Sequence, residues 1–311
     1  MKITVIGTVN KDLILPFGKA PIESFGGIFY DIAVLAKLYP TAEIIPVSYV
    51  GEDVLSTVHA ILDKMPNVSR NGLVHTSEKN HKVILEYKSP TQREEKSLFP
   101  FPSLTWEQIA PFSDSDMIIV NMITGWDIEH EAYLQLSALA KDRMYFDIHY
   151  LTMAADDFGQ RKPRAPENCR EWLSGSKFVQ MNEDEYEVLA KKSRSEVDFF
   201  QNYFDEDQIL LITKGANGVL MLYQREGMIG QREYPAYKIP RLIDTTGCGD
   251  VFGAAFVGYY LQSGDSFAAV EYANLVAGVN TMLKGTNEME LLVEKMKMLK
   301  LTNAANIKQE N

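Results

Sequence analysis

Short apolar segments recur along the chain and alternate with segments of helical periodicity, and this alternation limits the fold more than any other feature. Strands covered on both faces in a parallel sheet are apolar at nearly every position. Segments of this kind are 3–9, 43–50, 117–122, 144–148, 177–181, 209–213 and 219–223. Apolar residues with i, i+3, i+4, i+7 spacing, typical of amphipathic helices, occur at 32–39 and 289–296. The alternation predicts an α/β layered fold with right-handed crossovers.

Two segments, about 12–29 and 75–103, do not follow this pattern. The first mixes Pro and Gly with extended-type residues, and the second contains an alternating run at 82–88 and a charged turn at 92–96. We expect both to contribute hairpin strands to a small antiparallel sheet, here called the lid, over the main domain. Ordinary long surface loops are the alternative, although such loops are uncommon inside compact domains. The main domain then spans 1–301, and 302–311 is a polar C-terminal tail.

Composition narrows the class of protein. The 311 residues are 46% hydrophobic and 23% charged, which is typical of a folded globular chain. With 31 Lys and Arg against 42 Asp and Glu, the net charge is −11, which disfavours binding to nucleic acid or an anionic membrane. Two cysteines, Cys169 and Cys248, form neither a disulfide framework nor a zinc set. With no long apolar run and no signal-peptide pattern, we expect a soluble cytoplasmic protein.

The segment 242–260 carries the clearest chemical signal. Helical spacing after Gly249 places Gly247, Cys248 and Gly249 at a helix N-terminus, where the first amides lack intrahelical partners and the dipole is positive. Such a turn can bind phosphate oxygens. Asp250 falls in the first helical turn, as a partner of the dipole or as a general base. For a bare Gly-x-Gly-Asp, capping is the simpler interpretation, but the longer run 244–252 is more specific.

The run Asp244-Thr-Thr-Gly-Cys-Gly-Asp-Val-Phe252 closely resembles the second signature of the ribokinase-like (PfkB) family of carbohydrate and nucleoside kinases. Further segments resemble other motifs of that family and come in family order, over nearly the whole chain: 7–12, 26–33, 50–53, 182–185 and 213–218. The resemblance implies a ribokinase-like three-layer α/β/α domain with a central, mostly parallel sheet and a small β lid. It also implies transfer of a phosphoryl group from ATP, with Mg²⁺, and without a P-loop.

In that family Asp250 would be the base that takes a proton from the acceptor hydroxyl, and the amides of Gly247, Cys248 and Gly249 would form an anion hole. Position 248 is Cys where the family usually has Ala. Cysteine is small enough to preserve the turn, but a thiol beside an anion could make activity sensitive to oxidants.

The resemblance assigns the nucleotide to Asn182, Thr213, Gly215 and Gly218, and Mg²⁺, through water, to Glu185. From the residues alone, Asn182 and Glu185 have the spacing of a capping box, and both roles are compatible. The other three residues alone are equally typical of a strand end and a tight turn.

Acceptor binding is assigned by the resemblance to Asn10, Asp12, Gly26, Gly27 and Asp31. Asn10 and Asp12 follow the first strand, and open parallel sheets bind ligands beyond the carboxyl ends of their strands. A simple turn aspartate is the alternative for Asp12. Asp31 stands where many sugar kinases have Asn, which exchanges a donor-acceptor for an acceptor and should change the acceptor substrate.

His149 occupies a position where some sugar-acid kinases carry Asn and Arg, but we expect an exposed loop histidine. The leading hypothesis is an ATP-dependent kinase for a hydroxyl of a sugar or similar small molecule. Alternatives are an adenosine-like nucleoside kinase, a catalytically silent ligand-binding homologue and, from the α/β pattern alone, a dehydrogenase. Nucleoside binding is suggested by the aromatic residues near the lid, which equally suit lid packing: Phe17, Phe25, Phe29 and Tyr30. The sequence leaves open a monovalent-cation requirement and a homodimer formed through the lid.

Overall fold

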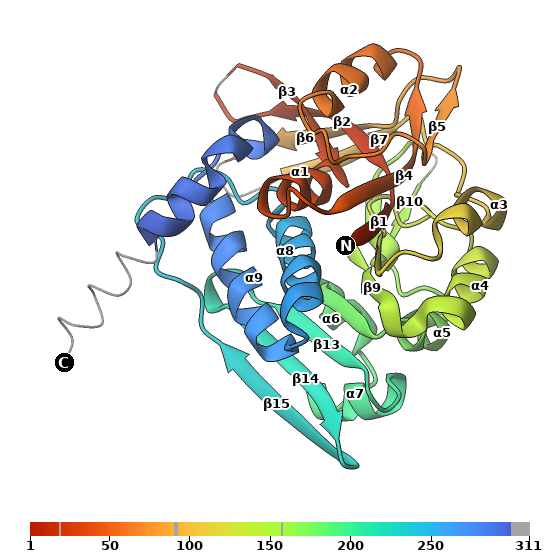
Figure 1. Ribbon diagram of the computed structural model, residues 1–311, viewed down its shortest axis with the longest axis vertical. Coiled ribbons are helices and arrows are strands. Elements are labelled where there is room, and N and C mark those ends of the chain that lie inside the picture. The colour runs from red at the N-terminus through yellow and green to blue at the C-terminus, as the bar shows by residue number, and fades with distance from the viewer. Residues whose placement is uncertain (19, 90–92, 157, 300–311) are drawn as a thin grey trace.

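A nine-stranded sheet forms the centre of the molecule (Figure 1). The computed structural model describes residues 1–299 except 19, 90–92 and 157. The strand order is β15 (Met228–Tyr234), β14 (Val219–Arg225), β13 (Ile209–Thr213), β12 (Phe178–Asn182), β9 (Met144–Asp147), β8 (Met117–Asn121), β1 (Lys2–Ile6), β4 (Glu43–Gly51) and β5 (Leu73–Thr76). The strands from β13 to β5 are parallel, and β14 and β15 are antiparallel additions at one edge.

Helices cover both faces of this sheet and produce three layers. One hydrophobic core joins the sheet to α1 (Phe29–Leu38), α2 (Leu55–Leu62), α8 (Cys248–Ser263), α9 (Ser266–Asn280), the 3₁₀ segment η5 (Gly285–Leu291) and a final helix at 292–299. The opposite core contains α3 (Trp106–Ile109), α4 (His130–Ala140), α5 (Cys169–Ser174), α6 (Glu183–Leu189) and α7 (Glu196–Tyr203). The predicted three-layer α/β/α architecture is confirmed.

The apolar strands are explained by this double coverage. In β8, Met117 and Ile119 belong to one core, and Ile118 and Val120 to the other. Since successive side chains point to opposite faces, a strand between two helical layers must be apolar throughout. The strand predicted at 219–223 is found, but it pairs antiparallel with β13.

The lid is a separate four-stranded sheet in the order β3 (Ile22–Gly27), β2 (Val9–Leu15), β6 (Lys82–Tyr87) and β7 (Arg93–Leu98). It joins strands from two distant parts of the chain, as predicted, with β2 and β6 running parallel in its middle. Pairing of two lids into a homodimer stays a prediction.

Three expectations for these segments are corrected. The second lid segment begins with β6 at residue 82 and not at residue 75, because β5 (73–76) pairs with β4 at the edge of the main sheet. Residues 93–96 belong to β7 and are not a turn, and residue 92 lies outside the described part. The predicted helix at 289–296 begins as the 3₁₀ segment η5 and becomes α-helical at 292. The predicted tail, 302–311, lies outside the described residues.

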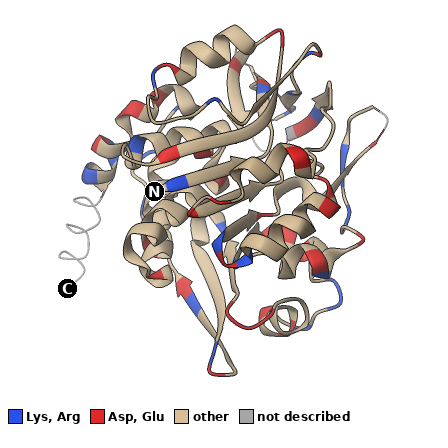
Figure 2. Ribbon diagram, turned by 45° about the vertical axis from the view of Figure 1, so that its right-hand side comes forward, with Lys and Arg blue, Asp and Glu red and all other residues tan. Residues whose placement is uncertain are grey.

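Figure 2 shows positions of Lys and Arg interspersed with positions of Asp and Glu over the ribbon. In this view the described Lys and Arg residues do not gather into a basic face on this protein of net charge −11. Among the described residues, no helix is both long and apolar enough to cross a bilayer.

Helix α8 is packed against the sheet by Phe256, which is fully buried and lies 4.9 Å from the Phe178 ring and 5.4 Å from the Tyr145 ring, measured between centroids. We expect Phe256→Ala to lower the free energy of unfolding by about 3–5 kcal/mol, because it removes a large side chain and leaves a cavity. Urea titration followed by circular dichroism measures this change. The control is Leu139→Ala, since Leu139 is 62% exposed and its loss should change stability by less than about 0.5 kcal/mol. Equal effects of the two substitutions would contradict this packing.

Candidate active site

A cavity of about 320 Å³ lies at the carboxyl ends of the parallel strands, where the start of α8 meets the lid. The lid contributes Val83, Leu85 and Glu95 to its wall. Several of the site residues predicted from the sequence also line it: Asn10, Asp12, Gly27, Asn182, Glu185, Thr213, Gly247, Cys248, Gly249 and Asp250. The fold thus gathers residues from both ends of the chain, as the strand-end rule for open sheets requires.

The glycine turn at the start of α8 has a left-handed conformation. Gly247 is the N-cap with a φ of 74°, and a Cβ there would lie 2.4 Å from the Tyr30 ring, so only glycine fits. Asp244 Oδ1 fixes the preceding turn by accepting from the Thr246 amide (2.9 Å) and hydroxyl (2.7 Å). Among the described residues, no backbone carbonyl accepts from the amides of Gly247 or Gly249. These two amides are therefore suited to an anion, whereas the Cys248 amide donates to the Thr245 carbonyl at 3.3 Å.

Asp250 lies in the first turn of α8 and is only 5% exposed. Its Oδ1 accepts a 2.8 Å hydrogen bond from Asn121 Nδ2, at the end of β8. Burial raises the pKa of Asp250, while nearby His149 and the Asn121 hydrogen bond act in the opposite direction. A carboxylate that borders a cleft and has a raised pKa is typical of a general base.

Asp147 and His149 stand beside Asp250, and one ligand atom of each of the three side chains lies within 4.8 Å of the others. His149 is half-buried and lines the cavity wall. The expectation of an exposed loop histidine is thus corrected. Its backbone adopts a φ of 35°, which is uncommon for a residue other than glycine. Strained backbone of this kind clusters at functional sites. The three groups also have the chemistry to hold a metal ion.

Asp147 accepts a 2.7 Å hydrogen bond from Gln180 Nε2, which also donates to the Gly249 carbonyl at 3.1 Å. Burial, reinforced by the charges of Glu185, Asp250 and Asp31, raises the pKa of Asp147 well above its ordinary value. Asp147 and Gln180 were not predicted as site residues from the sequence. Each is a polar residue in an otherwise apolar strand, as is Asn121 in β8, and this pattern could have indicated them.

Asn182 and Glu185 form the predicted capping box. Asn182 Oδ1 accepts from the Glu185 amide at 2.9 Å, and the Glu185 carboxylate accepts from the amide and side chain of Asn182 at 2.7 Å each. Although part of Glu185 is reached by solvent, its carboxyl lies deep in the cleft, and burial is the main cause that raises its pKa to about 8. Asp250 and Asp184 raise this pKa further, and the Asn182 hydrogen bond opposes them.

The remaining nucleotide residues separate in space. Thr213, at the end of β13, lines the cavity, and its hydroxyl lies 3.4 Å from the Met181 carbonyl. Gly215 and Gly218 flank the 3₁₀ turn that follows and are not among the lining residues. Gly218 has a φ of 92°, and a Cβ there would overlap the Tyr234 carbonyl, so a packing role explains this glycine.

The acceptor residues also divide into two groups. Asn10 and Asp12, on β2, are each 6% exposed and line the cavity, as does Gly27 on β3. Gly26 does not line it, and the Asp12 carboxylate occupies the space that a Cβ on Gly26 would need. Asp31 is 1% exposed and lies behind the wall, where Oδ2 accepts from Asn121 Nδ2 at 3.1 Å. Neither Asp31 nor Asn121 is among the residues that line the cavity, and contact of Asp31 with an acceptor stays a prediction.

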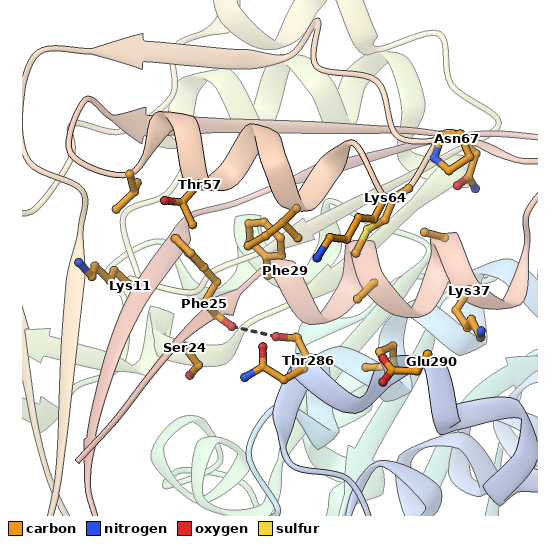
Figure 3. A pocket seen from close by; sticks show the side chains of 18 of the residues that line it. Lys11, Ser24, Phe25, Phe29, Lys37, Thr57, Lys64, Asn67, Thr286 and Glu290 are labelled. Atoms are coloured by element: carbon orange, nitrogen blue, oxygen red, sulfur yellow. Dashed lines mark hydrogen bonds between the residues drawn. The ribbon is translucent and has the colours of Figure 1, made fainter. Parts of the chain in front are cut away.

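A second, larger cavity of about 800 Å³ lies on the other side of α1, bordered by α2, β3 and η5 (Figure 3). Phe29 and Tyr30 are neighbours in α1 but line different cavities, and only Tyr30 belongs to the cavity that contains Asp250. Phe25 lines the larger cavity and packs against Phe29 at 5.4 Å between ring centroids. Neither phenylalanine lines the cavity of Asp250, and Phe17 is 59% exposed, so only Tyr30 of the four aromatic residues named above reaches that cavity.

Cys248 lines the cavity, and its thiol is held by polar contacts. Its Sγ contacts the Ala277 carbonyl at 3.6 Å and accepts from Asn280 Nδ2 at 3.4 Å. Burial raises the pKa of this thiol to about 11, which disfavours the reactive thiolate. Sensitivity of the activity to oxidants stays a prediction.

Comparison with known proteins agrees with this geometry. The model of the pfkB family of carbohydrate kinases matches residues 71–291. A deoxyribokinase from Salmonella typhi is 33% identical over 103 residues, which are 33% of this chain and 30% of that protein. A nucleoside kinase from Methanocaldococcus jannaschii is 31% identical over 110 residues, 35% of this chain and 34% of that protein. These matches thus span about a third of each relative.

The fold is shared over a much greater length. A fructokinase from Xylella fastidiosa, solved with bound ATP, superposes with a TM-score of 0.73 at 18% sequence identity and covers 96% of this chain and 99% of that one. Because the family model extends across more than half of the sequence, and the glycine turn, Asp250 and the lid lie where the motifs predict, this chain belongs to the pfkB family of carbohydrate kinases.

Proposed function

We propose that this protein is an ATP-dependent kinase that phosphorylates a hydroxyl group of a sugar or similar small molecule. The observation that carries the proposal is the buried Asp250 carboxylate beside the glycine turn, in a cavity that the lid borders. A base and an anion-binding turn suffice for phosphoryl transfer, which depends on positioning and charge stabilisation. Curated relatives named as a deoxyribokinase and a nucleoside kinase support this chemistry.

Each group has a defined role in the proposed reaction. Asp12 and Asn10 would orient the acceptor by hydrogen bonds to its hydroxyls, because both are buried polar groups in the wall. Asp250 would accept the proton of the acceptor hydroxyl. The hydroxyl oxygen would form a bond to the γ-phosphorus of ATP while the bond between that phosphorus and the β,γ-bridging oxygen breaks, and ADP would leave. The amides of Gly247 and Gly249 would stabilise charge on the transferred group.

Asn182 and Thr213 line the same cavity as the glycine turn and would contact the nucleotide. Glu185, which lines this cavity too, would hold Mg²⁺. Both carboxylate oxygens of Glu185 accept from Asn182, so a bound metal would be reached through water. When present, Mg²⁺ would neutralise the charge of the triphosphate. The raised pKa of Glu185 would make metal binding depend on pH, because the carboxyl must lose its proton before it attracts a cation.

The placement of the phenylalanines favours a sugar over a nucleoside. Phe25 and Phe29, which could stack on a base, line the other cavity and not the one that contains Asp250. A nucleoside kinase is the second candidate, favoured by the relative of that name. The test is a panel of pentoses, deoxypentoses, hexoses and nucleosides with ATP and Mg²⁺, with phosphorylated products detected by mass spectrometry. Sugar phosphates support the proposal, nucleotides alone support the second candidate, and no product supports a silent homologue.

Replacing the base should abolish turnover while leaving nucleotide binding intact. We expect Asp250→Asn to lower kcat by about 10²- to 10⁴-fold, because the amide cannot accept the proton. Steady-state kinetics measures the loss, and titration with a non-hydrolysable ATP analogue measures binding. Asp265→Asn, at the start of α9, makes the same chemical change outside the cavity and should leave kcat unaltered. Normal turnover by Asp250→Asn would exclude Asp250 as the base.

The metal requirement should depend on the ionisation of Glu185. With a pKa of about 8, the carboxyl is largely protonated at neutral pH and becomes ionised as the pH rises, so the Mg²⁺ concentration for half-maximal rate should fall with increasing pH. We expect Glu185→Gln, whose single side-chain oxygen can still accept from the Asn182 amide, to raise that concentration and flatten its pH dependence. Glu183→Gln, in the same helical turn, is the control. Identical Mg²⁺ titrations for Glu185→Gln and wild type would leave Glu185 with its capping role alone.

A further inference from the structure

The Asp250 carboxylate is held from the side away from solvent by a side chain that no family motif in this sequence includes. Asn121 is fully buried at the last position of β8. Its Nδ2 donates to Asp250 Oδ1 at 2.8 Å and to Asp31 Oδ2 at 3.1 Å. One amide group thus connects two buried acidic side chains from the starts of α8 and α1.

This arrangement fixes the orientation of the Asn121 amide. Turning the amide over would place its oxygen against two carboxyl oxygens, which can donate only when protonated, so the observed orientation is the one that gives two hydrogen bonds to ionised carboxylates. Asp31, as the second acceptor, holds the NH₂ group in the place from which it also reaches Asp250. No other side chain in the described part of the chain donates to the Asp250 carboxylate.

The network is not arranged for stability alone. Asn121 Oδ1 and Asp31 Oδ1 are both buried without a hydrogen-bond partner among the described residues. Buried polar atoms without partners are rare in folded proteins because each one is destabilising. Asp127, a buried carboxylate nearby in sequence, is by contrast bonded at both oxygens, by the Thr8 hydroxyl and by the hydroxyl and amide of Thr124. A site that retains the destabilising atoms is best explained by a role in the reaction.

We propose that Asn121 and Asp31 are positioning residues, which hold the Asp250 carboxylate so that Oδ1 is occupied and Oδ2 is left to accept the proton of the acceptor hydroxyl. The inference rests on the proposed function of Asp250 as the base. It gives residue 31, where many sugar kinases have Asn, the role of a hydrogen-bond acceptor, which the oxygen of either side chain can fill. In this chain residue 31 accepts a hydrogen bond from Asn121 and does not line the cavity.

The test compares substitutions that change this network without adding bulk. Asn121→Leu has a similar shape but no donor, so the Asp250 carboxylate loses its fixed orientation, and we expect kcat to fall by about 100-fold with the acceptor KM little changed. Asp31→Leu should lower kcat similarly, whereas Asp31→Asn can still accept through its amide oxygen and should restore most of the rate. The double variant Asn121→Leu/Asp31→Leu should be no slower than the slower single variant, because both disturb one unit.

Asp127→Asn is the matched control for a buried carboxylate outside the network, and it should leave kcat unchanged. Circular dichroism and binding of a non-hydrolysable ATP analogue establish that each variant is folded. A folded Asn121→Leu variant with wild-type kcat would overturn the proposal, and so would an equal loss in Asp127→Asn or a failure of Asp31→Asn to recover activity.

The role of Asp250 as base and the positioning role of Asn121 can be tested separately. If Asp250→Asn abolishes turnover but Asn121→Leu does not alter it, the base assignment stands and the positioning inference is wrong. If the wild-type protein transfers no phosphoryl group, the proposed function fails, and the crystal structure of Asn121→Leu decides the inference. A changed Asp250 rotamer would support positioning by Asn121, and an unchanged rotamer would refute it.

Discussion

A carboxylate buried at the positive end of a helix is the interaction on which the rest of the site depends. Burial disfavours the charge of Asp250 and raises its pKa, while the start of α8, the Asn121 amide and nearby His149 favour it. These opposing effects leave a carboxylate with raised proton affinity next to the amides of Gly247 and Gly249, which have no backbone partner in the described part of the chain. A surface aspartate at the same helical position would be only a capping residue.

The architecture brings the necessary groups together because parallel strands end at one edge. Asn121, Asp147 and Asn182 lie at the ends of three neighbouring strands, β8, β9 and β12, and α8 begins beside them. Asn10 and Asp12 lie on the lid strand β2, which follows β1 directly, so the lid and the sheet both line the cavity that contains Asp250. Helix α1 and strand β2 also separate this cavity from the larger one, which explains why adjacent residues such as Phe29 and Tyr30 have different roles.

Local patterns made most of the fold predictable. Apolar strands between two helical layers, the glycine turn before α8 and the capping box at Asn182 depend on neighbouring residues, and the structure contains all three. The edge strand β15 was missed because its sequence is polar, and β5 because it is short. The positions of His149 and Asn121 depend on contacts between distant segments. No local pattern shows that their side chains meet Asp250 or that Phe25 turns away from the cavity.

The central claim is that the glycine turn and Asp250 together surround a phosphoryl group in transfer. A crystal structure with Mg²⁺, a non-hydrolysable ATP analogue and an acceptor found in the substrate panel tests this claim most directly. The account predicts the terminal phosphate within hydrogen-bond distance of the Gly247 and Gly249 amides, and an acceptor hydroxyl at Asp250 Oδ2. A terminal phosphate bound elsewhere, or a hydroxyl that does not reach Asp250, would contradict it.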